Sequence, residues 1–257
     1  MVAGVPERCA TVRGAGADRG RTAAGGLAAY TRHVIPDQRR PGVFLTLEGP
    51  DGSGKSSLAP RLADALRARG CDVVATREPG STRLGERIRD LLLSTEPGLG
   101  HTGSADAFLF AAARAQHVTE VIRPALARGA VVVCDRFADS SMAYQGYGSG
   151  VPVEELAVVQ RLATGGLVPD LTLLLDLPVE AGLRRKAGGD LDEMTRFEAS
   201  FDVAFHQRVR DAFLAFAAAD PTRYRILDAT APLDEVTARA LDAVLAAGLP
   251  HPCLAPA

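Results

Sequence analysis

The chain has 257 residues, 47% of them hydrophobic and 23% charged, which is enough to bury a large core in one domain. A formal net charge of −2, from 29 basic and 31 acidic residues, excludes a strongly basic protein of the kind that binds nucleic acid. Apolar runs stay below the roughly 20 residues that a membrane span needs, so we expect a cytoplasmic protein without a membrane partner. Cys9, Cys71, Cys134 and Cys253 are scattered along the chain, which predicts reduced thiols.

Residues 1–42 differ in composition from the rest of the chain. They are rich in Gly, Ala and Arg, carry seven arginines against three acids, and show no apolar periodicity. Such a segment cannot bury enough apolar surface to fold, so we expect a disordered extension. A targeting peptide or a misassigned start codon are the alternatives. The ordered domain is predicted over residues 43–250, followed by a short tail at 251–257.

From Val43 onward, apolar runs of strand length alternate with segments of helical periodicity. Pro60 and Pro124 fall inside two of the expected helices, where proline removes a backbone donor. This alternation predicts an α/β fold of three layers, with a five-stranded parallel sheet and its ligand site beyond the carboxyl ends of the strands. Strands are expected at 43–49, 71–80, 130–135, 171–178 and 224–229, and helices at 58–70, 84–94, 105–129, 151–166, 195–219 and 232–247.

A glycine-rich loop follows the first strand. Its sequence, GPDGSGKS, fits the pattern G-x-x-x-x-G-K-[ST] of a phosphate-binding loop, in which backbone N–H groups and a helix N-terminus converge on a nucleotide phosphate. Lys55 is expected to reach the β- and γ-phosphates of ATP, and the Ser56 hydroxyl to hold Mg²⁺. The ATP contacts are predicted at Gly49, Pro50, Asp51, Gly52, Ser53, Gly54, Lys55, Ser56 and Ser57.

Two missing motifs narrow the class of nucleotide-binding protein. The sequence holds no Asn, which excludes the N-K-x-D segment that reads guanine in regulatory GTPases. It also lacks the L-S-G-G-Q segment of transport ATPases.

Three further segments carry a family resemblance. They are TREPG at 76–80, FAAAR at 110–114 and DRFADSSMAYQG at 135–146. Together with the loop they resemble bacterial thymidylate kinases, which are phosphate-loop nucleoside monophosphate kinases, over residues 43–246. The resemblance implies transfer of a phosphoryl group from ATP to dTMP with Mg²⁺, and it leaves a homodimer open.

The resemblance also implies an acceptor site. Arg136 and Arg77 are expected to grip the dTMP phosphate, because the guanidinium fork matches phosphate geometry. Asp135 either organises Mg²⁺ through water or orients Arg136. Phe110 would stack on the pyrimidine, although by itself it reads as a core aromatic residue, and Asp51 would face the sugar 3′-hydroxyl. The predicted acceptor-binding residues are Asp51, Arg77, Phe110, Arg114, Arg136, Ser140, Ser141, Tyr144 and Gln145.

A basic lid is expected over about 184–196. The phosphate loop has Gly52 where some family members carry an arginine, so the resemblance requires a lid arginine beside the transferred phosphoryl group, and we assign Arg185. Together with Lys55, Arg136 and Asp135 it completes the predicted catalytic set. A solvated basic turn is the alternative for the lid. The ATP base is expected near residues 228–230.

Two other functions fit the sequence. One is a kinase of another pyrimidine nucleotide or of a deoxynucleoside, for which Glu78 or Asp135 could act as base. The other is a nucleotide-binding module without catalysis.

Overall fold

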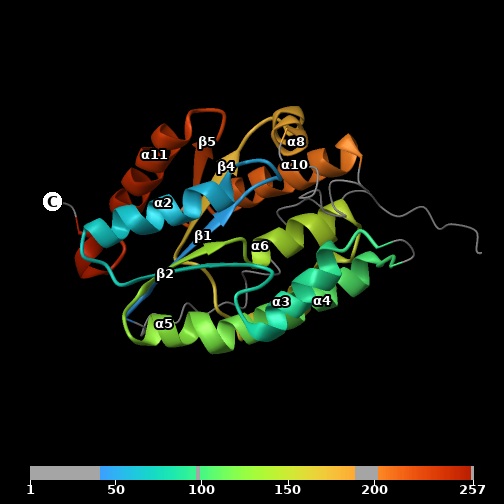
Figure 1. Cartoon of the computed structure of the whole chain (residues 1–257), viewed down its shortest axis with the longest axis horizontal. Coiled ribbons are helices and arrows are strands. Elements are labelled where there is room, and N and C mark those ends of the chain that lie inside the picture. The colour runs from blue at the N-terminus through green and yellow to red at the C-terminus, as the bar shows by residue number, and fades with distance from the viewer. Residues whose placement is uncertain (1–40, 97–98, 189–201, 256–257) are drawn as a thin grey trace, which may run out of the picture.

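The structure is a computed structural model that describes residues 41–96, 99–188 and 202–255 (Figure 1). Five parallel strands form one sheet in the order β2-β3-β1-β4-β5. The predicted α/β fold is confirmed. The N-terminal extension up to residue 40 and the lid residues 189–196 lie outside the described residues. The strands are β1 (Val43–Glu48), β2 (Val73–Arg77), β3 (Val131–Asp135), β4 (Leu171–Asp176) and β5 (Tyr224–Asp228).

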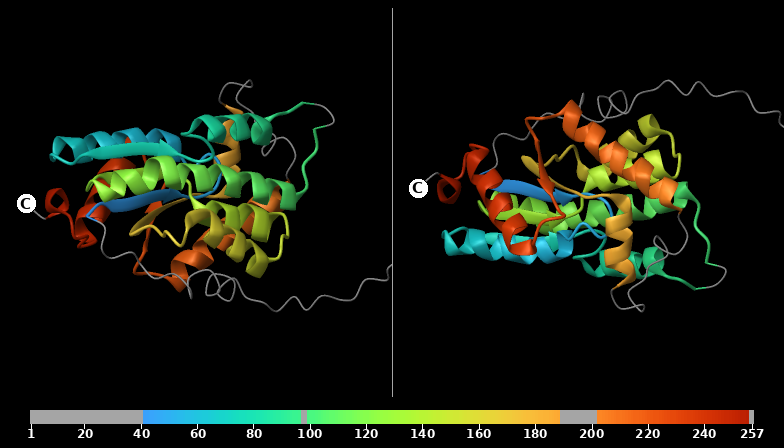
Figure 2. Two further views of the ribbon diagram at one scale, coloured as in Figure 1. Left: turned by 90° about the horizontal axis from the view of Figure 1, so that it is seen from below. Right: turned by 90° about the horizontal axis from the view of Figure 1, so that it is seen from above.

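Helices cover both faces of the sheet. α2 and α11 pack on one face, and α5, α10 and the helices next to them pack on the other (Figures 1 and 2). The helices are α2 (Lys55–Ala68), α3 (Arg83–Leu93), α4 (Gly103–His117), η1 (Val118–Ile122), α5 (Arg123–Ala127), α6 (Ala138–Ser141), η2 (Met142–Gly148), α7 (Val153–Thr164), α8 (Val179–Ala187), α10 (Val203–Ala219), α11 (Leu233–Ala246) and η4 (Pro252–Leu254).

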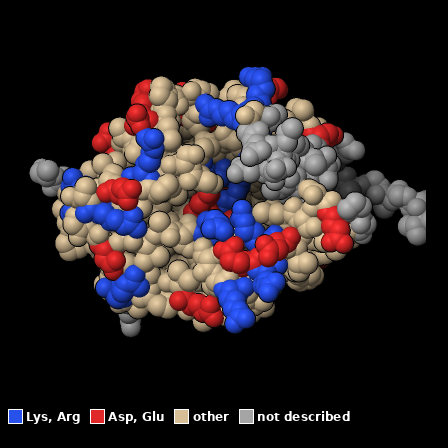
Figure 3. All heavy atoms as spheres, in the orientation of Figure 1, with Lys and Arg blue, Asp and Glu red and all other residues tan. Residues whose placement is uncertain are grey.

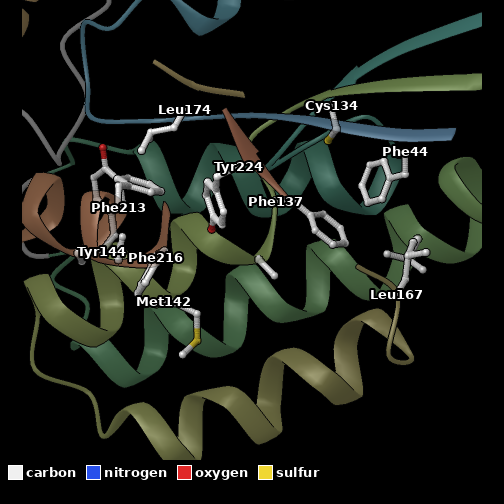
Figure 4. Close-up of a cluster of buried hydrophobic side chains, with 14 of the residues drawn as sticks. Phe44, Cys134, Phe137, Met142, Tyr144, Leu167, Leu174, Phe213, Phe216 and Tyr224 are labelled. Carbon is white, nitrogen blue, oxygen red and sulfur yellow. The ribbon is translucent and has the colours of Figure 1, made fainter. Parts of the chain in front are cut away.

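The central strands are buried on both faces, as their nearly continuous apolar sequences predict. In β1, Phe44 enters one core and its neighbour Leu45 enters the other, because successive side chains of a strand point to opposite faces. The aromatic core is drawn in Figure 4. In it the rings of Phe44 and Phe137 meet edge to face at 4.9 Å.

The register of the sheet brings three strand ends together. Leu47 of β1 and Arg77 of β2 both pair with Asp135 of β3. The phosphate loop after β1, the TREPG segment after β2 and Arg136 after β3 therefore leave the sheet at one edge. This edge holds the site described below.

Two prolines are accommodated without ending their helices. α2 is one continuous helix from Lys55 that includes Pro60, so it starts at the phosphate loop. Before Pro124 the helix passes through the π-helical segment η1, and then continues as α5. In a π-helical turn the backbone hydrogen bonds are shifted by one residue. This shift accommodates the N–H group that proline lacks.

Two helical segments were missed in the sequence. Residues 138–148 form α6 and η2, and residues 179–187 form α8. The basic residues that we assigned to the start of the lid therefore lie in the last turn of a helix.

The prediction of reduced thiols is wrong for one pair of cysteines. Cys71 and Cys253 form a disulfide across 182 residues of sequence, whereas Cys134 is a buried free thiol. The disulfide holds the C-terminal segment at the end of the sheet where β2 begins. His251 adds a contact to the Gly129 carbonyl oxygen at 2.8 Å, and Arg69 donates to the Ala255 carbonyl at 2.9 Å. Sequence spacing gave no sign of a pair so far apart.

This disulfide should contribute to stability and not to activity. A cross-link that closes a long loop restricts the unfolded chain, and we expect reductant to lower the thermal midpoint by on the order of 5–10 °C. Cys253→Ser should start at the lower midpoint and not respond to reductant. Thermal melts of both proteins with and without dithiothreitol measure this. A wild-type midpoint that ignores reductant would contradict it.

Candidate active site

A cavity of about 800 Å³ opens at the carboxyl ends of the strands. In Figure 3 it is the hollow in the middle of the face, with Lys and Arg side chains in and around it. The phosphate loop and the start of α2 line one side, and the ends of β2 and β3 with α4 line another. Basic residues from six separate segments border it: Lys55, Arg77, Arg89, Arg114, Arg136, Arg185 and Lys186.

The phosphate loop holds a buried lysine at the N-terminus of α2. Lys55 Nζ donates to the Pro50 carbonyl oxygen and to Ser53 Oγ, both at 2.8 Å. Burial, helped by the nearby Arg136 charge, lowers the pKa of Lys55 to about 7. A phosphate placed at this helix N-terminus would favour the charged form of Lys55, so the loop is suited to bind an anion.

Gly52 cannot be replaced by a larger residue in this loop. Its φ is +74°, and a Cβ built on it would lie 2.1 Å from the carbonyl oxygen of Gly182 in α8. The reverse contact is equally tight, since a Cβ on Gly182 would lie 2.4 Å from the Asp51 carbonyl oxygen. Close packing of α8 therefore excludes a side chain at the loop position where an arginine was considered.

Ser56 and Asp135 form a pair suited to Mg²⁺. Ser56 Oγ donates to Asp135 Oδ2 at 2.6 Å, and Asp135 Oδ1 is buried without a partner among the described residues. Mg²⁺ prefers oxygen ligands and usually keeps several waters and substrate phosphates, so one hydroxyl and one carboxylate fit it. The described residues hold no group of three or more His, Cys, Asp or Glu that would form an all-protein metal cage.

Arg136 bridges the phosphate loop and the segment after β3. Its Nη1 donates to the Gly49 carbonyl oxygen and to Ser140 Oγ, both at 3.1 Å, and its Nη2 donates to Asp51 Oδ1 at 2.5 Å. Its guanidinium also lies 5.1 Å from the centre of the Tyr144 ring. Burial opposes the charge, but Tyr144 and the surrounding carboxylates raise the pKa of Arg136, so it stays cationic. Arg136 and Lys55 outweigh burial at Asp51 and lower the pKa of that carboxyl.

Arg114 is held at the other end of the cavity by the protein itself. It is fully buried, and its Nε donates to Glu78 Oε2 at 2.7 Å. Its Nη1 contacts Ser141 Oγ and Gln160 Oε1, and its Nη2 donates to the Phe137 carbonyl oxygen at 2.9 Å. A guanidinium has five N–H groups, so one on Nη2 has no partner among the described residues. Arg114 can therefore give one hydrogen bond to a ligand.

The other residues predicted for acceptor binding line the same cavity. Phe110 lies on the Arg114 side of α4, and Ser141, Tyr144 and Gln145 come from α6 and η2. Ser140 also borders the cavity, but its hydroxyl is bonded to Glu48 and Arg136. The structure thus brings together all the residues predicted for the acceptor site, and their individual roles stay predictions.

Arg77 is the least suited of them to hold a phosphate. Its side chain is 49% exposed and its Nη2 donates to both Glu86 oxygens, at 3.0 and 3.1 Å, so its charge is already balanced.

Arg89 of α3 lines the cavity as well, and the sequence did not predict this. Its Nη1 donates to the Pro79 carbonyl oxygen at 2.9 Å. Burial and the nearby Arg77 lower the pKa of Arg89, and the Glu86 and Asp135 carboxylates offset this only in part. In the sequence, Arg89 is one of several polar residues on an expected amphipathic helix.

The opposite end of the cavity lies beside the loop after β5. Arg185 Nη1 donates to the Ala229 carbonyl oxygen at 2.8 Å, and residues 229–233 line the wall there. This is the region where sequence analysis expected the ATP base. Arg185, which we predicted to contact the transferred phosphoryl group, is bonded to this loop.

Comparison with known proteins identifies the family. A family model described as thymidylate kinase matches residues 47–240, which is more than half of the chain. This chain belongs to the thymidylate kinase family. It is 54% identical to the thymidylate kinase of Pseudomonas fluorescens and 50% identical to that of Desulfovibrio desulfuricans, in each case over 79% of this chain and 95% and 94% of the relative. The crystal structure of thymidylate kinase from Ehrlichia chaffeensis superposes with a TM-score of 0.62 at 31% identity, covering 79% of this chain and 98% of the other.

The part of the chain matched by the thymidylate kinase model contains the whole cavity. The residues that line it run from Asp51 to Val236. Among the described residues, no helix is long and apolar enough to cross a membrane.

Proposed function

We propose that this member of the thymidylate kinase family transfers the γ-phosphoryl group of ATP to dTMP, with Mg²⁺, and releases ADP and dTDP. The observation that carries the proposal is one cavity in which a phosphate loop faces a second set of arginines. Two anionic nucleotides placed end to end repel each other, and fixed positive groups between them offset this repulsion.

The donor is proposed to lie along the phosphate loop. The backbone N–H groups of the loop and Lys55 would bind the β- and γ-phosphates, and the base would lie against residues 229–233. Ser56 and Asp135 would hold Mg²⁺, which supplies charge neutralisation at the phosphates when bound. Arg185 and Lys186 border this half of the cavity and add positive charge beside it.

The acceptor is proposed to lie between Arg136 and Arg114. An oxygen of the dTMP phosphate attacks the γ-phosphorus, the bond to the ADP oxygen breaks, and no strong base is needed because the phosphate oxygen is already ionised. Arg136 and Arg89 would hold this phosphate. At the far end, the remaining Arg114 N–H and Gln145 would bond the pyrimidine edge while Phe110 stacks on its face. Asp51 would meet the 3′-hydroxyl.

The alternative of a deoxynucleoside kinase needs a free base near the 5′-hydroxyl. Glu78 does not qualify, since its Oε2 is paired with Arg114 and its Oε1 lies 2.9 Å from His117 Nδ1. Asp135 is bonded to Ser56. Glu78 is therefore engaged at both oxygens, and the remaining Asp135 oxygen is proposed to face Mg²⁺, which favours a monophosphate as acceptor.

A substrate panel tests the proposed reaction. With ATP and Mg²⁺ fixed, ADP release should be fastest with dTMP, slower with dUMP and dCMP, and negligible with thymidine. Removal of Mg²⁺ by EDTA should abolish it, and Lys55→Ala should lower turnover by about 100-fold or more while the thermal midpoint shows an intact fold. Fastest turnover of thymidine would overturn the choice of acceptor.

Arg77 and Arg89 provide a matched pair of variants. We expect Arg89→Ala to raise the KM for dTMP roughly tenfold or more, because the variant removes a half-buried guanidinium that is proposed to hold the acceptor phosphate. Arg77→Ala, which removes an exposed ion pair with Glu86, should change it by less than about threefold. Steady-state kinetics at saturating ATP measure both. A larger effect at Arg77 would restore our original assignment.

We also propose a homodimer formed by the outer face of α3, α4 and α7. These helices lie side by side (Figure 2) and carry most of the large apolar side chains that the described residues expose. Phe108 is 63% exposed and Leu162 is 84% exposed. Apolar side chains gathered on one helical layer indicate an interface. The exposed residues are Leu84, Leu91, Phe108, Val158 and Leu162.

Sedimentation equilibrium tests the dimer. The wild type should sediment as a dimer at micromolar concentration, and Phe108→Asp should shift it toward monomer without lowering the thermal midpoint of the fold. A monomeric wild type rules the interface out.

Two weaker expectations follow from the proposed substrates and from the charge of the chain. The use of ATP is consistent with the cytoplasm, and cell fractionation that finds the protein elsewhere would refute this. A net charge of −2 gives no driving force for nucleic-acid binding, so a gel-shift assay should show none.

A further inference from the structure

Glu48 is a buried carboxyl group with no role in the chemistry described above. It is the last residue of β1, it is 0% exposed, and the phosphate loop begins at the next position. The cavity does not include it. Its contacts reach the segment that carries Arg136.

The Glu48 carboxyl binds the first turn after β3. Its Oε1 accepts from Phe137 N at 2.8 Å and from Ser140 N at 3.3 Å, and its Oε2 lies 2.5 Å from Ser140 Oγ. These are the backbone donors that open α6, and α6 has no side-chain cap from its own residues. A helix start normally needs such an acceptor, and here it comes from a residue 89 positions earlier in the sequence.

The same turn holds Arg136 in an unfavourable backbone conformation. Arg136 has φ +69°, a left-handed value that costs a non-glycine residue of the order of 1–3 kcal/mol and persists only when its neighbours enforce it. Two consecutive amides are fixed by the end of β1, since Arg136 N donates to the Leu47 carbonyl oxygen at 2.9 Å and Phe137 N to Glu48. Ser140 Oγ then links the Glu48 carboxyl to the Arg136 guanidinium.

We propose that Glu48 is a positioning residue for the acceptor phosphate: by capping the turn after β3 it holds Arg136 at a fixed place relative to the phosphate loop. This inference rests on the proposed function, since Arg136 is the proposed phosphate ligand. Glu48 itself contacts no substrate. The phosphate loop follows Glu48 directly at the end of β1. The residues at this one strand end therefore position both the donor and the acceptor phosphates.

The protonation of Glu48 suits this structural role. Burial and the Asp139 carboxylate raise the pKa of Glu48 to about 8. Asp139 Oδ2 accepts from Arg223 Nη1 at 2.7 Å and from the Tyr224 hydroxyl at 2.6 Å. Glu48 therefore carries a proton at neutral pH, and a glutamine amide of similar shape would keep the acceptor oxygen for Phe137 N and Ser140 N and place an N–H beside Ser140 Oγ.

Four variants test the proposal by separating the KM for dTMP from the KM for ATP. Glu48→Ala should raise the KM for dTMP roughly tenfold or more and leave the KM for ATP within about twofold. Glu48→Gln should recover most of that loss, and Glu48→Asp, whose carboxyl is withdrawn by one methylene group, should not. Asp170→Ala is the matched control: Asp170 Oδ2 accepts from Phe44 N at 2.7 Å near the opposite end of β1, so its loss should change neither KM.

An unchanged KM for dTMP in Glu48→Ala overturns the proposal, as does an equal rise in both KM values that Glu48→Gln fails to correct. If Glu48→Ala does not fold, Glu48→Gln and Glu48→Asp decide, and equal KM values for dTMP in these two overturn it. Calorimetric titration of dTMP into the same variants gives a readout that does not depend on turnover. A wild type that binds but does not phosphorylate dTMP would refute the proposed function and leave the test of Glu48 in force.

Discussion

The contact between Arg136 and the phosphate loop is the interaction on which the site depends. The guanidinium joins the carbonyl oxygen of Gly49, the carboxylate of Asp51 and the hydroxyl of Ser140, so three segments meet at one side chain. A cation in this position would be expensive to bury alone. The surrounding anions and dipoles remove that cost, and they keep the charge in place before a substrate arrives. Electrostatic stabilisation of this kind needs no rearrangement at the moment of reaction.

The cations around the cavity differ in their partners. Arg114 and Arg77 are each paired with a glutamate, the first in the core and the second near the surface, and Arg136 is paired with Asp51. Such pairs orient the side chains. Lys55 and Arg89 are the cations whose pKa burial lowers, so both gain most from an added anion. They lie on α2 and α3 and both line the cavity.

The sequence predicted the strands and the phosphate loop because these features are local, and it predicted the rest of the cavity through the resemblance to thymidylate kinases. A buried strand followed by a glycine-rich loop and a lysine is a short pattern with one structural solution. What it did not predict depends on contacts between distant segments. The pairing of Cys71 with Cys253 follows from the path of the C-terminal segment, and the suitability of Arg89 over Arg77 follows from which of them Glu86 neutralises. Glu48 read as the polar end of an apolar strand, since nothing near it in sequence shows that it caps a turn 89 residues later.

The close approach of α8 to the phosphate loop decides where further positive charge can come from. Because the backbones of Gly52 and Gly182 touch, an arginine in the loop is excluded on steric grounds. The same helix brings Arg185 and Lys186 to the cavity in its last turn, where the negative end of the helix dipole favours cations. The contact between Gly52 and Gly182 thus leaves no room for a cation at this position of the loop. The same helix, α8, brings Arg185 and Lys186 to the opposite side of the cavity. A substitution that enlarged Gly182 would move both at once, since the loop and the basic turn of α8 are held together through that contact.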